Sequence, residues 1–460
     1  MRRIVRLLSI ALLLAACDDP AGVRAPRITG LAVDSADHPL VRTAAVVLDA
    51  PGQLLLAYAA EGTPTLVLET DSAALEHRVV LPRLRASRDY VLHAEVVGGV
   101  ERRSAAFSTA ALPADVAALR FEETGQATHP VSAVEVVLGA FRGLVLVEDG
   151  EVVWYRPTTG SLFGSTRRAN GDFVLLDPSL GLIQVALDGR IVHRLPQPDS
   201  APAAPYGRIH HDVTVTPSDR LLFIANETRT LAGVDVVGEA LWEWNPEANT
   251  VVRRWSAFDH LDWNTVRGSR SSASNWLHGN GVAFGPRGNV LLSLRNANLV
   301  ASIAPDFSRV EWTLGGAGST LQLDATERFW GQHYVSEPAN GRVLIYDNGF
   351  ERPEGRYTRV VEYAIDATAG RANPVWEYRH SPDVFAGLVG SARRLDNGHT
   401  VILFGMIGGD GDATGPLMAV EVTADGQERW RLTAAAGISR LYRVTPLASV
   451  AGEVRRWPED

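Results

Sequence analysis

The segment RGNVLLSLRN, residues 287–296, is a glycine turn followed at once by a short apolar strand. The same arrangement recurs in NGDFVLLD from Asn170, SDRLLFIANE from Ser218, NGRVLIYDNG from Asn340 and NGHTVILFG from Asn397. Successive turn residues are 48, 69, 53 and 57 positions apart; they are Gly171, Asp219, Gly288, Gly341 and Gly398. Residues of this kind supply the positive φ that a tight turn between strands requires. The chain therefore contains an internal repeat built from strands.

This repeat length is typical of one architecture. A period near 50 residues, with the variation carried by loops, indicates a β-propeller. A second pattern, a strand ending on tryptophan, recurs as GEVVWYR, GEALWEW, SRVEWTL, ANPVWEY and GQERWRL, and no helical period is present. Roughly 330 residues at about 50 to 57 per blade predict an all-β, six-bladed β-propeller over residues 131–455, with seven blades as the open alternative.

The region before the repeats has a different pattern. Residues 25–112 read as seven short alternating strands separated by polar breaks: ITGLAVD, TAAVVLDAP, LLLAYAAEG, TLVLETD, EHRVVLP, DYVLHAEVVGG and RRSAAFST. That spacing predicts a small immunoglobulin- or fibronectin-like β-sandwich. Tyr90, six residues after Leu84, matches the tyrosine corner of such sandwiches. We expect residues 113–130, rich in Ala, Pro and Glu, to be a linker.

The amino terminus reads as a targeting segment. Arg2, Arg3 and Arg6 precede an apolar run of ten residues, which is too short for a span of about 20 residues. The sequence LAAC at residues 14–17 resembles a bacterial lipobox, so residues 1–17 are predicted to be a lipoprotein signal peptide with Cys17 as the lipidated residue. An ordinary signal peptide is the alternative. Cys17 is the only cysteine, which excludes an intramolecular disulfide and a cysteine nucleophile elsewhere.

Composition excludes several function classes. The formal net charge is −9, which argues against a general nucleic-acid binder. All 44 basic residues are arginine. Without lysine, the chain can form neither a Schiff base with a cofactor nor the lysine contact of a P-loop.

Three histidines stand at the same place in the repeat. His211, His278 and His333 precede the turn residue of their repeats by 8, 10 and 8 positions. One histidine per repeat in this position would gather several imidazoles around one axis. The alternative is that these are histidines with satisfied hydrogen bonds beside tryptophans, or a recurrent packing element. Three in register favour a functional site.

The accompanying residues narrow the chemistry. Arg295 follows its strand one strand-length after His278. Asp212, next to His211, leaves a zinc site open, but a guanidinium in the same pocket disfavours a cation and favours an oxyanion such as sulfate or phosphate. Histidine can act as nucleophile, acid or hydrogen-bond donor near neutral pH. Together these groups suit transfer of a trioxo group, and we predict no metal and no cofactor.

At these residues the sequence resembles the bacterial arylsulfate sulfotransferases. The resemblance covers roughly residues 115–445 and rests on HHD at 210–212, WLHGNGVAFGPRGNVLLSLRNANLV at 276–300, VEWTLGG at 310–316, GQH at 331–333, VLIYDNG followed by TRVVEYAID, and GSARRLDNGHTVILFG at 390–405. Family members are periplasmic propellers preceded by a small β-sandwich. The resemblance implies sulfuryl transfer from an aryl sulfate ester to a phenolic acceptor, without a nucleotide donor.

The resemblance also implies residue roles. His333, in the QH motif, would be the nucleophile that forms a sulfohistidine, with a protonated neighbour donating to the departing phenolate. His278 and Arg295 would hold the sulfuryl oxygens, and His211 carries over as the earlier histidine, with His210 as the alternative one position away. The acceptor would then reverse the steps, which predicts ping-pong kinetics. Substrate-binding roles extend to Asn280, Trp276 and Trp330, although core packing is an equal explanation for the tryptophans.

Two other function classes stay open. One is a non-catalytic, lipid-anchored propeller that binds an anionic or sulfated ligand; the other is a hydrolase or quinone-dependent propeller, since a fold does not fix a function. The expected partners are the aryl sulfate donor, the phenolic acceptor and a membrane reached through the N-terminal lipid, with no nucleic acid and with a homodimer left open. The expected location is the periplasm, anchored to a bacterial membrane.

Overall fold

The computed structural model describes residues 25–35, 38–408, 415–435 and 437–456. The expected signal peptide and Cys17 lie outside these residues. Within them the protein is built of strands, and its two α-helices, α1 (Ala114–Ala117) and α2 (Ala257–His260), have four residues each. This confirms the all-β prediction. No helix among the described residues is long and apolar enough to cross a membrane.

The first unit contains two sheets. The seven strands expected between residues 25 and 112 are all present: β1 (Ile28–Ser35), β2 (Arg42–Gly52), β3 (Leu54–Ala60), β4 (Thr65–Glu69), β5 (Ala74–Leu81), β6 (Asp89–Val96) and β7 (Arg102–Ser108). Their order is β1-β2-β5 in one sheet and β4-β3-β6-β7 in the other, where β33 (Val454–Arg456) from the carboxyl end pairs with β4 as the outermost strand. The side chains of β3 alternate between buried and half-buried, as expected for a strand with one face on a core. The Tyr90 hydroxyl accepts a hydrogen bond from the backbone N–H of Arg85 at 2.8 Å, which is the contact a tyrosine corner makes.

Six further sheets follow, each antiparallel and of four or five strands. The first is β11 (Glu151–Pro157), β10 (Gly143–Glu148), β9 (Val131–Gly139) and β32 (Ile438–Leu447). The second and third are β12 (Ser165–Arg167), β13 (Phe173–Asp177), β14 (Gly181–Val185) and β15 (Ile191–Leu195), then β16 (Ile209–Val215), β17 (Leu221–Leu231), β18 (Val234–Asn245) and β19 (Thr250–Ser256).

The remaining three sheets, like the second and third, are built from strands that follow one another in the chain, and the last sheet has one additional strand. The fourth is β20 (Gly279–Phe284), β21 (Val290–Leu294), β22 (Leu299–Ile303) and β23 (Val310–Gly315). The fifth is β24 (Tyr334–Ala339), β25 (Arg342–Asp347), β26 (Arg359–Asp366) and β27 (Arg371–Arg379). The sixth is β28 (Ser391–Arg394), β29 (Thr400–Phe404), β30 (Leu417–Val422), β31 (Glu428–Ala434) and β8 (Phe121–Gly125). Three short 3₁₀ turns lie in loops: η1 (Pro198–Ser200), η2 (Arg295–Ala297) and η3 (Ala325–Glu327).

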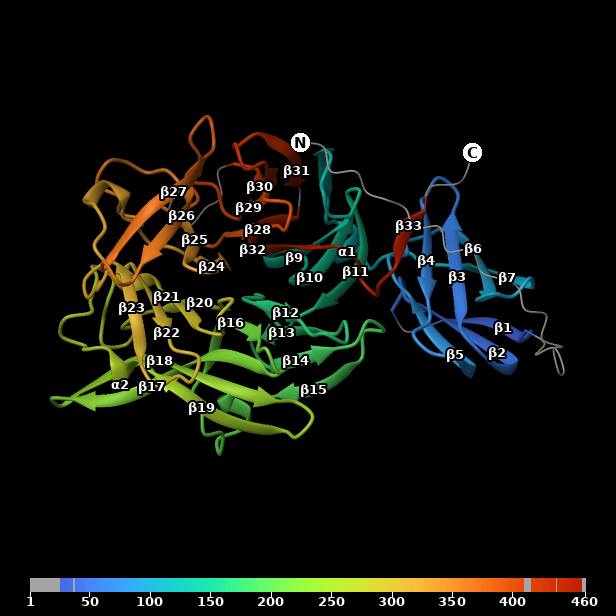
Figure 1. Cartoon of the computed structure of the whole chain (residues 1–460), viewed down its shortest axis with the longest axis horizontal. Coiled ribbons are helices and arrows are strands. Elements are labelled where there is room, and N and C mark those ends of the chain that lie inside the picture. Colours follow the sequence, from blue (N-terminus) through green and yellow to red (C-terminus); the bar gives the residue numbers. More distant parts are fainter. Residues whose placement is uncertain (1–24, 36–37, 409–414, 436, 457–460) are drawn as a thin grey trace, which may run out of the picture.

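The six sheets form a ring with their innermost strands in contact (Figure 1). Strand β12 contacts β16, and the contacts continue through β20, β24 and β28 to β32. The Glu135 carboxylate of β9 accepts hydrogen bonds from Gly164 N–H at 2.9 Å and from the Ser165 hydroxyl at 2.6 Å, which joins the first sheet to the second. Short inner strands therefore surround one axis.

Sheets packed face to face explain the apolar runs of the repeat. The second strands β13, β21 and β29 are buried at every position, because both faces of each sheet meet a neighbouring sheet. The turn residues before these strands have the expected positive φ: 90° at Gly171, 57° at Asp219, 80° at Gly288, 70° at Gly341 and 83° at Gly398. The sequence repeat and the sheet repeat are thus the same unit.

Two distant segments complete the ring. Strand β32, near the carboxyl end, pairs with β9 over Ile438–Leu447 and completes the first sheet. Residues 113–130, expected to be a linker, contain α1 and β8, and β8 pairs with β31 as the fifth strand of the last sheet. The spacing of turns did not predict β8. This strand has no repeat turn next to it, and its partner strand β31 is distant in the sequence.

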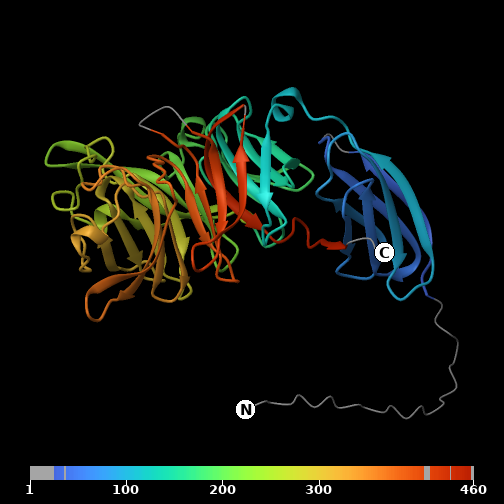
Figure 2. The same ribbon diagram turned by 90° about the horizontal axis from the view of Figure 1, so that it is seen from above.

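The chain then returns to its first unit. Strand β33 (Val454–Arg456) pairs with β4, so the last described residues add a strand to the first unit rather than to the ring. Figure 2 shows this carboxyl-terminal segment crossing from the ring to the unit of β1–β7. The boundary expected at residue 455 therefore falls inside a strand that joins the two parts.

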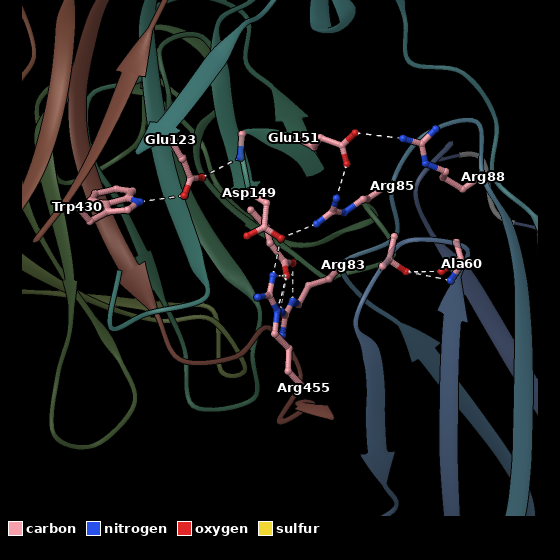
Figure 3. A network of polar contacts seen from close by, with 12 residues as sticks. Ala60, Arg83, Arg85, Arg88, Glu123, Asp149, Glu151, Trp430 and Arg455 are labelled. Atoms are coloured by element: carbon pink, nitrogen blue, oxygen red, sulfur yellow. Dashed lines mark hydrogen bonds and ion pairs between the residues drawn. The ribbon is translucent and has the colours of Figure 1, made fainter. Parts of the chain in front are cut away.

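Buried charges join the first unit to the ring. Arg83 donates to Glu148 at 2.7 and 2.5 Å and to Glu453 at 3.2 Å, and its side chain is 1% exposed. Arg455 binds Glu148 and Asp149, and Figure 3 shows Arg85 reaching Asp149 from the first unit. Removing one partner of such a buried network leaves an uncompensated charge.

We therefore expect Glu148→Ala to lower the free energy of unfolding by about 3–5 kcal/mol, since Arg83 and Arg455 both lose a carboxylate. The matched control is Asp34→Ala, which breaks a surface pair with Arg78 at 2.9 Å and should cost about 0–1 kcal/mol. Urea unfolding of both variants measures the difference. Equal costs would show that the network does not join the two parts.

Candidate active site

The three histidines in register lie where inner strands begin. His211 belongs to β16, His278 immediately precedes β20, and His333 immediately precedes β24. The rings of His211 and His278 meet edge to face with centroids 4.6 Å apart, and His333 and Arg295 lie close enough to lower the pKa of His211. The structure therefore brings together the four residues predicted from sequence.

The backbone is unusual at two of these histidines. His211 has φ of 60° and His278 has φ of 53°, in the left-handed region that few residues other than glycine adopt. The register between β16 and β17 also shifts between Ile209 and Val213, around His211. Such conformations are kept where the surrounding structure holds them, and they cluster at functional sites.

All of these histidines are neutral at neutral pH. Burial, followed by the charge of Arg295, lowers the pKa of His278 to about 4. Burial first, and nearby cationic groups second, hold the pKa values of His333 and His211 well below 6.5. A neutral imidazole keeps a lone pair, so it can act as a nucleophile or a base.

His210 lies beside the cluster. Its Nδ1 is 2.8 Å from Nδ1 of His211, and its buried Nε2 has no hydrogen-bond partner among the described residues. Burial and the charges of His278 and Arg208 lower the pKa of His210 to about 3. The structure thus places both histidines of the HHD motif at the site, with His211 in direct contact with His278.

Arg295 supplies an unpaired positive charge. It is 4% exposed at the start of η2, and its buried Nε and Nη2 have no hydrogen-bond partner in the described part of the chain. Burial lowers the pKa of Arg295 to about 10, with Arg270 contributing, so the guanidinium stays charged at neutral pH. A buried cation of this kind needs a partner. Its free N–H groups suit an oxyanion with two or more oxygens.

Two nearby carboxylates bind backbone N–H groups of β20. Asp212, which the sequence left open as a metal ligand, accepts from Val282 N–H at 2.7 Å and forms a buried ion pair with Arg443. Glu239 accepts from Gly279 N–H at 2.9 Å, and burial raises its pKa to about 7. Among the described residues no group of three His, Cys, Asp or Glu side chains could hold a metal ion. The unpartnered Nε and Nη2 of Arg295 favour an anion at this site.

Asn280 lies behind the site. It is fully buried, its Nδ2 donates to the carbonyl of Gln332 at 2.8 Å, and its Oδ1 accepts from the Ser293 hydroxyl at 2.8 Å. Because both ends of the amide bond the protein, Asn280 holds the residue before His333. The expected contact with substrate is not needed to explain its position.

The two tryptophans differ. Trp276 is 0% exposed in a hydrophobic core with Phe258 and Trp263, and its indole N–H donates to Val266 O at 2.7 Å, so it has no surface for a substrate ring. Trp330 is half-buried, and its backbone N–H donates to Asp347 at 2.8 Å, three residues before His333. Only Trp330 keeps an exposed surface near the histidines.

Sequence reasoning missed three residues beside this cluster. Asn275 donates from Nδ2 to Nδ1 of His278 at 3.1 Å. Asn348 accepts from Nδ1 of His333 at 2.8 Å. Arg270 lies over the ring of Phe350 at 3.7 Å, and its charge lowers the pKa of both His278 and Arg295. Asn348 stands inside the quoted motif VLIYDNG, but an amide after a strand carries no sequence signal of its partner.

Comparison with known proteins gives one family. The sequence model of the arylsulfotransferase family (ASST) matches residues 142–442, which is well over half of the chain and includes all four histidines and Arg295. No sequence among the curated proteins matches this chain.

Solved structures show remote likeness. Virginiamycin B lyase from Staphylococcus aureus has 10% identity and a TM-score of 0.33, covering 69% of this chain and 74% of that one. A quinonprotein alcohol dehydrogenase-like protein from Bacteroides thetaiotaomicron has 9% identity and a TM-score of 0.38, covering 87% and 94%. Likeness at this level carries no inference about the activity of this chain.

The neutral histidines predict loss of stability in acid. The unfolded chain binds protons on histidine below about pH 6.5, whereas folded His210 and His278, with pKa values of about 3 and 4, do not. The free energy of unfolding should therefore fall as pH decreases from about 6.5 toward 4. His210→Gln should reduce this fall. Urea unfolding at several pH values measures the free energy of unfolding. If its dependence on pH were unchanged in His210→Gln, a lowered pKa for His210 would be contradicted.

Proposed function

The chain belongs to the arylsulfotransferase family, and from this premise we propose that it transfers a sulfuryl group from an aryl sulfate ester to a phenolic acceptor through a covalent intermediate on His333. The observation that carries the proposal is the meeting of neutral imidazoles with a buried guanidinium that has no carboxylate partner. This set of groups matches a sulfate ester in both charge and hydrogen-bonding capacity.

Arg295 would bind the sulfuryl oxygens. Its Nε and Nη2 are buried and free, so a sulfate ester would satisfy two donors that otherwise remain desolvated. Charge is spread over these oxygens in a loose transition state, and fixed donors stabilise it without reorganisation. Arg270, which is partly exposed beside Phe350, pairs with Glu351 at 3.7 Å.

His278 would be a hydrogen-bond donor. Asn275 donates to its Nδ1, so in the neutral ring the proton is on Nε2. Arg295 lowers the pKa of His278, and a bound anion offsets that effect because an opposite charge favours the protonated form. Donor binding would therefore raise the pKa of His278, while its Nε2–H donates a hydrogen bond to the departing aryl oxygen.

The sulfuryl group would be transferred in two steps, first to His333 and then to the acceptor. A neutral His333 nitrogen forms an N–S bond while the S–O bond to the aryl group breaks, and a neighbouring imidazolium gives its proton to the aryloxide. The acceptor phenol next loses its proton to that neighbour, forms a new S–O bond and releases His333. The result is ping-pong exchange through a sulfohistidine.

We extend the proposal to the architecture and location. The six sheets are taken as blades of a six-bladed propeller, and strands β1–β7 as a preceding β-sandwich, with β33 joining it. Residues 1–17 are taken as a lipoprotein signal peptide and Cys17 as the anchor to a bacterial membrane facing the periplasm. A phenolic acceptor and an aryl sulfate donor, with no cofactor, complete the proposal.

The first prediction concerns the nucleophile. The full-length chain mixed with 4-nitrophenyl sulfate should release nitrophenolate in a way that depends on added phenol, and His333→Ala should abolish the release because no covalent intermediate can form. His93→Ala, in β6 of the first unit, is the matched control and should keep full activity. Mass spectrometry without phenol should find one SO₃ group on the His333 peptide.

The outcomes separate the alternatives. Wild-type activity in a folded His333→Ala variant would contradict the mechanism. Release that is equal with and without phenol would identify hydrolysis, and no release by the folded wild type would favour a binding protein or a narrower donor.

The second prediction concerns Arg295. We expect Arg295→Met to lower kcat on the order of 10²–10³-fold, because a charged donor to the transition state is lost while the apolar stem is kept. Arg287→Met removes a guanidinium from the same segment that only pairs with Glu311 on the surface, and it should leave kcat unchanged. Steady-state kinetics with both substrates measures the effect. A loss confined to KM would instead mean that Arg295 binds ground and transition states equally.

A further inference from the structure

We infer that Asn348 is a positioning residue that fixes His333 in the tautomer with its proton on Nδ1 and its lone pair on Nε2. The inference rests on the proposed role of His333 as nucleophile. It is carried by the hydrogen bond from His333 Nδ1 to Asn348 Oδ1 at 2.8 Å and by the contacts that hold the amide of Asn348 in one orientation.

Asn348 stands at a defined place in its sheet. The segments RGNVLLSLR (287–295) and NGRVLIYDN (340–348) align without a gap, so Asn348 occupies in the fifth sheet the position that Arg295 occupies in the fourth. Each directly follows the second strand of its sheet. The same position in the repeat is therefore occupied by the buried guanidinium of Arg295 in the fourth sheet and by the amide of Asn348 in the fifth.

The orientation of the amide is determined by its donors. Asn348 is 0% exposed, and its Nδ2 donates to Ala386 O at 2.7 Å and to Val389 O at 2.8 Å. Both N–H groups are used, and a carbonyl can accept only from the amide nitrogen. If the amide were flipped, its oxygen would lie beside the carbonyl oxygens of Ala386 and Val389 and would be repelled by them. The oxygen that faces His333 is therefore Oδ1.

The tautomer of His333 follows from this orientation. An amide oxygen only accepts, so Nδ1 of His333 must carry the proton that it shares with Asn348, and Gly331 O is a second acceptor at 3.3 Å. In a neutral ring the other nitrogen, Nε2, then carries the lone pair. At 5% exposure His333 has little water to compete for these bonds.

The carbonyl that binds Asn348 is itself held under strain. Val389 has φ of 54°, which is rare for a β-branched residue, and the residue after it is Gly390 with φ of 103°. Such a conformation costs on the order of 1–3 kcal/mol and persists only where the surroundings impose it. The structure keeps this geometry next to the group that orients Asn348.

A neutral acceptor also suits the task. Asn348 raises the pKa of His333, but burial and Arg295 outweigh it, and the pKa stays well below 6.5. The ring thus remains a nucleophile at neutral pH. When Nε2 forms a bond to sulfur, positive charge develops on the ring and the bond from Nδ1–H to Asn348 strengthens.

The test uses two variants and one control in the full-length chain. Asn348→Leu removes the acceptor at nearly constant volume, and Asn348→Ser removes it with a small side chain that leaves room for water. Asn226→Leu is the matched control, because SDRLLFIAN (218–226) places Asn226 in the same register of the third sheet, where its backbone N–H donates to Arg208 O at 3.0 Å. Folding is checked by thermal unfolding.

The first readout does not depend on activity. ¹⁵N NMR of histidine-labelled protein, with the His333 signal assigned from His333→Gln, should show the Nδ1–H tautomer in the wild type and in Asn226→Leu. Both Asn348 variants should lose it or show a mixture. Retention of a single Nδ1–H tautomer in both would overturn the inference.

The second readout is the division between kcat and KM. Both Asn348 variants should lose about 10²-fold or more in kcat for 4-nitrophenyl sulfate, by analogy with the effect of a wrong histidine tautomer, while KM for the donor changes little. A fall in melting temperature with kcat unchanged would show a merely structural role and would overturn the inference. If the tautomer changes as expected but the wild type transfers no sulfuryl group, the proposed function fails while the positioning role stands.

Discussion

The pairing of β32 with β9 joins segments about 300 residues apart and determines whether the inner strands form a closed ring. Without it, the first sheet lacks its innermost strand, and the strands that carry the histidines have no common axis. β32 also brings Tyr442 and Arg443 to the centre. The Tyr442 hydroxyl donates to Asn280 O at 3.1 Å, and Arg443 pairs with Asp212.

The same contacts lead to His333. Asn280 binds the carbonyl of Gln332, which precedes His333, so the closing strand supports His333 through two hydrogen bonds. Asp212 adjoins His211 and binds the backbone of β20. Ring closure and site geometry are therefore coupled.

The buried polar groups of the site destabilise the folded protein. Several imidazoles and a guanidinium are buried with no carboxylate among them, which lowers their pKa values and costs stability while the site is empty. Left-handed backbone at His211 and His278 adds strain. A bound anionic substrate would accept hydrogen bonds from the unpaired N–H groups and reduce the repulsion among the positive groups. Binding would therefore stabilise the fold that bears the site. Natural sites commonly accept such a cost for function.

The sequence alone determined the repeat, the strand content and the residue types of the site. Positive-φ turns and apolar strands at intervals near 50 residues predicted the sheets because these features depend on neighbours in the chain, and the register of His211, His278 and His333 predicted their meeting. What only the tertiary structure decided were contacts between distant segments. β8, β32 and β33 pair with strands far away in the sequence, Trp276 is enclosed in a core rather than open to a ligand, and Asn348 binds His333 across 15 residues. The physical reason is that a hydrogen-bonding group or an isolated strand does not specify its partner. The partner is chosen when the ring closes and brings the two together.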